Sequence, residues 1–158
     1  MELDAGARAP VSILQSIALG FITALASGIL GAFLFIAGLV VADPTELTDT
    51  SLGQGLAELL FMFVFVALFG ALYALIFSWF PIAIVGLAMQ RAACRWPFLW
   101  SRPAHSFVGA ICGIALSLLG VRDGRFETFD LLLLLYGALC GIFAALFFRY
   151  LANKLPSA

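Results

Sequence analysis

Charged residues are scarce in this chain, and the long apolar runs have none near their middles. Only 11% of the 158 residues are Asp, Glu, Lys or Arg, whereas 64% are hydrophobic. A soluble domain could not hide that much apolar surface from water. The composition therefore excludes an ordinary soluble domain and indicates a chain that lies mostly in lipid.

Histidine and cysteine are too few for most metal and haem chemistry. His105 is the only histidine, so it cannot supply bis-histidine haem ligation, and we expect it to be an interfacial polar residue. The three cysteines, Cys94, Cys112 and Cys140, are an odd set that implies no disulfide framework. We expect no cofactor, no metal and no nucleic-acid partner.

Catalytic signatures are also missing from the sequence. It contains no serine-nucleophile, phosphate-loop or zinc-peptidase pattern. Small drug–proton antiporters need a carboxylate within a span, disulfide oxidoreductases need paired surface cysteines, and lipoprotein signal peptidases need aspartates in a polar pocket. This chain offers none of these arrangements. We predict no catalytic residue and expect that the protein is not an enzyme.

What the chain does contain is four long apolar stretches. They cover approximately 11–42, 56–80 with an extension to 89, 104–121 and 128–151. Each is at or near the length of about 20 residues that crosses a hydrocarbon core of about 30 Å. The predicted fold is therefore all-α, a polytopic membrane protein with four transmembrane helices in one antiparallel bundle. Residues 1–158 are expected to form a single domain.

Positive charges gather on one side of this predicted bundle. The 90–103 connection and the C-terminus are rich in Arg and Lys, whereas the 43–55 connection has only acidic charges. Positive residues in short connections stay in the cytoplasm. We expect an integral protein of the bacterial inner (plasma) membrane with both termini cytoplasmic. The first stretch is too long for a signal h-region, so we expect an uncleaved span.

The second stretch is longer than one crossing requires. A straight helix over 56–89 would extend about 51 Å. Pro81 has no amide to bond the carbonyl of Phe77, and its ring clashes there, which predicts a kink near Pro81. The extension is expected either to lie in the membrane interface or to continue as a tilted helix.

Arginine and tryptophan are interleaved after this extension. The candidate residues for contact with lipid headgroups or a partner are Arg91, Arg95, Trp96, Trp100 and Arg102. Both side-chain types are favoured in the headgroup region. The segment therefore fits either an ordinary positive-inside connection or a specific site for anionic lipid or a partner.

Small and polar residues follow one face of the first stretch. The members of this stripe, which spans a sector of roughly 100° on a helix, are Ser12, Ser16, Gly20, Thr23, Ser27, Gly31 and Gly38. Such a stripe is typical of a packing seam, because helices in lipid associate by close backbone approach. The alternative is the wall of a polar solute pathway, with Ser16, Thr23 and Ser27 as the candidate residues.

Nearly the same heptapeptide occurs in the third and fourth stretches. Gly109 and Gly113 are four residues apart in one copy, and Gly137 and Gly141 in the other. The short connection between these stretches predicts a hairpin. Glycines at this spacing let backbones approach closely, so we expect the two pairs to pack together.

A fainter similarity relates the two halves of the chain. Residues 68–72 read Leu-Phe-Gly-Ala-Leu and residues 135–139 read Leu-Tyr-Gly-Ala-Leu. The match suggests two hairpins related by an axis along the membrane normal, although apolar segments also match by chance.

Two functions fit these observations. The first is a non-catalytic accessory or structural subunit that packs against lipid, other membrane proteins or further copies of itself. The alternative is a small oligomeric transporter or channel that uses the Ser/Thr face of the first span. Dry seams between the helices would favour the first function, and a continuous polar cavity would favour the second.

The charge asymmetry predicts where reporter domains will be found. A reporter fused after Pro156 should be cytoplasmic, and one inserted within 43–52 should lie on the opposite side of the membrane. Enzymatic reporters that are active in only one compartment measure this directly. Activity of both fusions in the same compartment would contradict the four-span topology.

Overall fold

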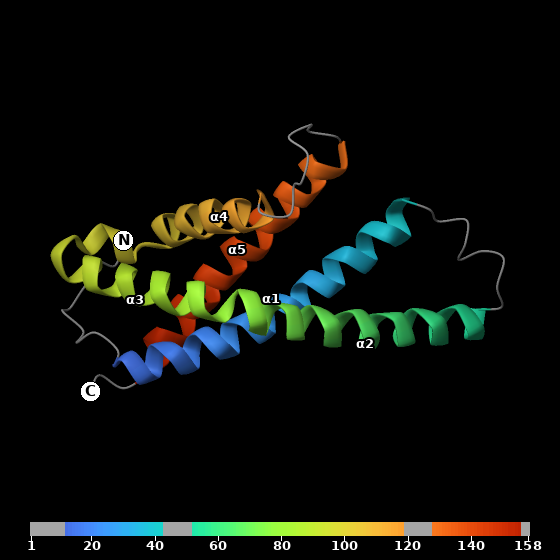
Figure 1. Cartoon of the computed structure of the whole chain (residues 1–158), viewed down its shortest axis with the longest axis horizontal. Helices are drawn as coiled ribbons and strands as arrows, with labels where there is room; N and C mark the ends of the chain where they lie inside the picture. The colour runs from blue at the N-terminus through green and yellow to red at the C-terminus, as the bar shows by residue number, and fades with distance from the viewer. Residues whose placement is uncertain (1–11, 43–51, 119–127, 156–158) are drawn as a thin grey trace.

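The chain is helical throughout the part that the structure describes. This computed structural model describes residues 12–42, 52–118 and 128–155, over which no strand occurs. The elements are α1 (Ile13–Ala42), α2 (Leu52–Phe77), α3 (Trp79–Arg95), the 3-10 helix η1 (Pro97–Trp100), α4 (Arg102–Leu118) and α5 (Thr128–Lys154) (Figure 1). The all-α prediction is confirmed for these residues. The predictions that concern residues 1–11, 43–51, 119–127 and 156–158 lie outside the described residues.

Three of these helices are long and apolar enough to cross a membrane. The apolar segments are Ile13–Gly38 of α1, Ala57–Phe77 of α2 and Leu131–Lys154 of α5, with lengths of 21 to 26 residues. These lengths match a hydrocarbon core of about 30 Å, which is consistent with an integral membrane protein. The helix α4 has 17 residues, so the fourth crossing that was assigned to 104–121 stays a prediction.

A single residue, Ser78, separates α2 from α3. The Ser78 amide donates to the Ala74 carbonyl over 2.8 Å, and the Ile82 amide donates to the Ser78 carbonyl over 3.0 Å. Pro81 lies in the first turn of α3, where a missing amide is tolerated. The two helices follow one another along the long axis (Figure 1). The long second stretch is thus two helices, and the kink near Pro81 stays a prediction.

The helix α1 is at the centre of the arrangement. It packs against α2, α3 and α5, and 50% of its apolar window is buried, compared with 11% in both α2 and α5. Gly20 of α1 lies against α3, Gly28 against α2 and Gly31 against α5. A Cβ atom at Gly28 would lie 2.6 Å from the Cα atom of Ala71. The contacts at Gly20 and Gly28, which meet backbone atoms, therefore depend on the absence of a side chain.

The small and polar stripe of the first stretch coincides with this contact face of α1. Its five central members are buried, and its end members, Ser12 and Gly38, are exposed. The opposite face carries exposed apolar side chains such as Phe21 and Phe33. The stripe therefore faces neighbouring helices, which is the geometry expected of a packing seam.

The most extensive contact between two helices joins α4 and α5. Gly109 lies against the carbonyl of Gly141, and Gly113 lies against the carbonyl of Gly137. This order means that the two helices run in opposite directions. The structure therefore brings the four glycines that were predicted to pack together to one crossing, where the two backbones touch.

This crossing predicts a large cost for any side chain at Gly113. Gly113→Leu should lower the free energy of unfolding in detergent micelles by about 1–3 kcal/mol, because overpacking forces backbones apart. Gly38→Leu is the matched control, since no atom lies within 4 Å of a Cβ atom built there. Equal stability of the two variants would contradict the close contact between α4 and α5.

Candidate functional site

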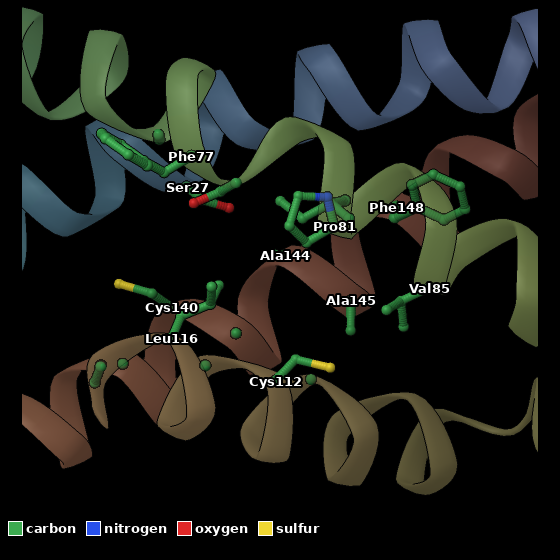
Figure 2. A pocket seen from close by; sticks show the side chains of 18 of the residues that line it. Ser27, Phe77, Pro81, Val85, Cys112, Leu116, Cys140, Ala144, Ala145 and Phe148 are labelled. Atoms are coloured by element: carbon green, nitrogen blue, oxygen red, sulfur yellow. The ribbon is translucent and has the colours of Figure 1, made fainter. Parts of the chain in front are cut away.

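An apolar cleft lies between α1–α3 on one side and the α4–α5 pair on the other. Its volume is about 800 Å³, within the range of about 300–1,000 Å³ that is typical of small-molecule sites. Pro81 and Val85 of α3 face Cys112 and Leu116 of α4 across this space (Figure 2). The lining is mostly aliphatic, aromatic or glycine, so the cleft suits an apolar occupant.

The two groups of helices meet where Tyr136 of α5 reaches Gly31 of α1 and again near one end of the molecule. There Gly86 of α3 lies against the ring of Phe148 of α5, and Phe148 forms a small buried core with Leu19 and Ala152. Away from this core, α2 packs on α1 and makes no extensive contact with α4 or α5. The helices α2 and α5 diverge from there (Figure 1), which leaves the space between them open.

Two buried polar atoms at the cleft have no hydrogen-bond partner among the described residues. They are the Oγ atom of Ser27 and the Nε2 atom of His105, and both residues line the cleft. Ser27 is 8% exposed and His105 is 3% exposed. An unpaired buried polar group costs about 1–3 kcal/mol. A bound group that paired with these atoms would recover part of that cost.

The ring of His105 is held in one orientation by its neighbours. Its Nδ1 atom lies 3.2 Å from the carbonyl oxygen of Ser101, and the Trp100 ring meets it edge-on with centroids 4.8 Å apart. A carbonyl oxygen only accepts, so Nδ1 carries the proton of this bond. In the neutral imidazole Nε2 is then an acceptor. At the end of the cleft that His105 lines, the Nε2 atom is therefore a hydrogen-bond acceptor.

Trp100 also joins η1 to the end of α5. Its Nε1 atom donates to the Oδ1 atom of Asn153 over 3.0 Å, and its carbonyl accepts a 2.7 Å bond from the Nε atom of Arg149. The guanidinium carbon of Arg149 lies 6.0 Å from the centre of the Trp100 ring, within cation–π range. Trp100 thus places Arg149 and His105 at the same end of the molecule.

The predicted headgroup or partner residues lie around this cluster. Arg91, Arg95, Trp96 and Arg102 are exposed, and Trp100 is half-buried. Arg149 and His105 were not predicted to belong with them. His105 is 3% exposed and lines the cleft, and its expected position at the membrane interface stays a prediction. The sequence offered one indication of a fixed His105 ring, because Ser101 precedes His105 by one helical turn and its carbonyl can orient that ring.

The candidate pathway residues do not share one cavity. Ser16, Thr23 and Ser27 are all buried, but only Ser27 lines the cleft. Ser16 and Thr23 lie on the face of α1 that contacts other helices. Within the described ranges, therefore, the three hydroxyl groups form no continuous polar wall.

Cys112 and Cys140 add thiols to the cleft lining. Both residues are half-buried, and thiols in apolar surroundings behave as small apolar groups. Among the residues with described positions, no three His, Cys, Asp or Glu side chains gather where they could hold a metal ion. No family model, curated protein or solved structure matches this chain.

Proposed function

We propose that this chain is a non-catalytic protein of the bacterial inner membrane, an accessory or structural subunit that packs against partner membrane proteins and lipid. The observation that carries the proposal is the exposure of α2 and α5, whose apolar windows are only 11% buried. Apolar helices with so little cover must contact lipid or other helices. The chain taken alone therefore has apolar surface available for further packing.

The proposal includes four spans in one antiparallel bundle. The close crossing of α4 with α5 supports α4 as a span, because α5 is itself long and apolar enough to cross a membrane. The helix α2 would make one crossing, and α3, after a kink near Pro81, would either lie in the membrane interface or continue as a tilted helix. Both termini and the exposed arginines on either side of η1 would then lie on the cytoplasmic side.

We assign the partner to the exposed aromatic face of α2. Phe61, Phe65 and Phe69 are exposed there, and their ring centroids are 6.4 Å and 4.6 Å apart in sequence order. Rows of aromatic rings provide large rigid contact areas. Because α2 is covered extensively only by α1, this row is free to pack against a helix of a partner protein.

A photo-crosslinking residue at Phe65 should therefore yield a discrete protein adduct in intact membranes. The same residue at Leu132, which is exposed on α5, is the control and should react mainly with lipid. Immunoblots of the two variants measure the adducts. Lipid adducts alone at both positions would contradict the partner surface on α2.

A small oligomeric transporter or channel is the second candidate. The observation that favours it is the unpartnered Ser27 hydroxyl at the cleft. In an oligomer, further copies of the chain would have to complete the polar wall that Ser16 and Thr23 do not provide. This candidate would make Ser27 part of the solute path.

Flux into liposomes that contain only the purified protein separates the two candidates. For a packing subunit, we expect no saturable flux of small ions or sugars above protein-free liposomes. The combined change Thr23→Val and Ser27→Ala should also alter stability little, because hydrogen bonds between membrane helices average about 0.6 kcal/mol. Saturable flux that this double variant abolishes would replace the packing subunit with the transporter.

A further inference from the structure

We propose that the cleft binds one molecule of phosphatidylglycerol. Its acyl chain would lie between α3 and the α4–α5 pair, its phosphate at Arg102 and Arg149, and a headgroup hydroxyl would donate to Nε2 of His105. This inference rests on the proposed membrane location and goes beyond it by naming the lipid.

The apolar part of the cleft accounts for the binding of an acyl chain but does not determine which lipid is bound. Ile82, Val85 and Leu116 are among the side chains that line its volume of about 800 Å³. An acyl chain that moves from the bilayer into this space exchanges one apolar environment for another, so burial gives little selectivity. Discrimination between lipids must therefore come from the polar end.

Two arginines, Arg102 and Arg149, lie beside the His105 end of the cleft but do not line it, and no acidic side chain of the described ranges accompanies them. Arg102 begins α4 two residues after Trp100, and the Trp100 carbonyl accepts the bond from Arg149. Glu58, the acidic residue whose side chain is described, belongs to the second turn of α2, and the N-terminal part of α2 lies at the opposite end of the molecule (Figure 1). The bond from Arg149 to the Trp100 carbonyl uses only Nε, one of five guanidinium donors. Two neighbouring guanidinium groups favour a phosphate.

His105 adds a requirement that phosphate alone does not meet. Its Nε2 atom is a buried acceptor at the cleft without a partner in the described part of the chain. An ionised phosphodiester has no proton to donate, whereas the glycerol headgroup has hydroxyl groups. An ethanolamine headgroup also has donors, but its ammonium group would lie beside two guanidinium groups. Glycerol is therefore the headgroup that satisfies both features.

Native mass spectrometry of the delipidated full chain in detergent tests this assignment. The probes are phosphatidylglycerol, phosphatidylmethanol and phosphatidylcholine with identical oleoyl chains. We expect phosphatidylglycerol to bind about tenfold more tightly than phosphatidylmethanol, which lacks the hydroxyl, and phosphatidylcholine to bind most weakly. Equal binding of phosphatidylglycerol and phosphatidylcholine by the wild-type protein would overturn the proposal.

Variants assign each preference to a residue. Arg102→Gln should remove the preference for phosphatidylglycerol over phosphatidylcholine, and Arg95→Gln, an exposed arginine at the same end, should retain it. His105→Phe should remove the preference over phosphatidylmethanol, while His105→Gln keeps an acceptor and should keep part of it. Equal effects of the two arginine variants, or an unchanged preference in His105→Phe, would contradict the assigned roles.

Three further measurements distinguish binding in the cleft from binding at the surface, and distinguish failure of this inference from failure of the proposed function. Cys112→Phe should weaken binding of all three lipids by filling the cleft, and the soluble headgroup glycerophosphoglycerol should not compete. Competition by that headgroup at equal concentration would show that the cleft contributes nothing and would overturn the site. Extraction of the protein from membranes by alkaline carbonate would instead refute the membrane location, whatever the lipid preference.

Discussion

Helix backbones in this protein touch one another at glycine, and the rest of the arrangement depends on these contacts. Gly28 lies against Gly70 between α1 and α2, and Gly113 lies against Gly137 between α4 and α5. Within a bilayer no hydrophobic force draws apolar helices together, so dispersion between closely fitted surfaces must hold them. Side chains larger than hydrogen at these points would separate the helices and weaken that attraction over their whole length.

The cleft follows from how these contacts are distributed. They are concentrated within the α1–α2 and α4–α5 pairs, while α1 and α5 meet at Gly31 and Tyr136 and α3 and α5 meet at Gly86 and Phe148. The pairs are therefore closely packed inside and loosely packed against each other. The similar segments 68–72 and 135–139 make similar contacts. The central glycine of the first, Gly70, lies against Gly28 of α1, and that of the second, Gly137, lies against Gly113 of α4.

Local patterns in the sequence were enough to predict that the chain is helical and that three of its stretches are long and apolar enough to cross a membrane, because periodicity and length depend on neighbouring residues. The burial of His105 and the bond from Arg149 to Trp100 could not be predicted in this way. That bond joins residues 49 positions apart, and the cleft depends on how two helix pairs lie against each other. The division at Ser78 was anticipated only as a kink near Pro81, since a proline does not specify where a helix restarts.

Because only Ser78 separates α2 from α3, a change in bilayer thickness would change the width of the cleft. A span that does not match the local hydrocarbon thickness changes its tilt, and α2, which packs extensively only on α1, is the helix least restrained from tilting. Tyr73 and Phe77 line the cleft from α2 and would move with it, while α3 stays against α1 and α5. A thinner or thicker membrane would thus alter the width of the cleft without disturbing the α4–α5 contact.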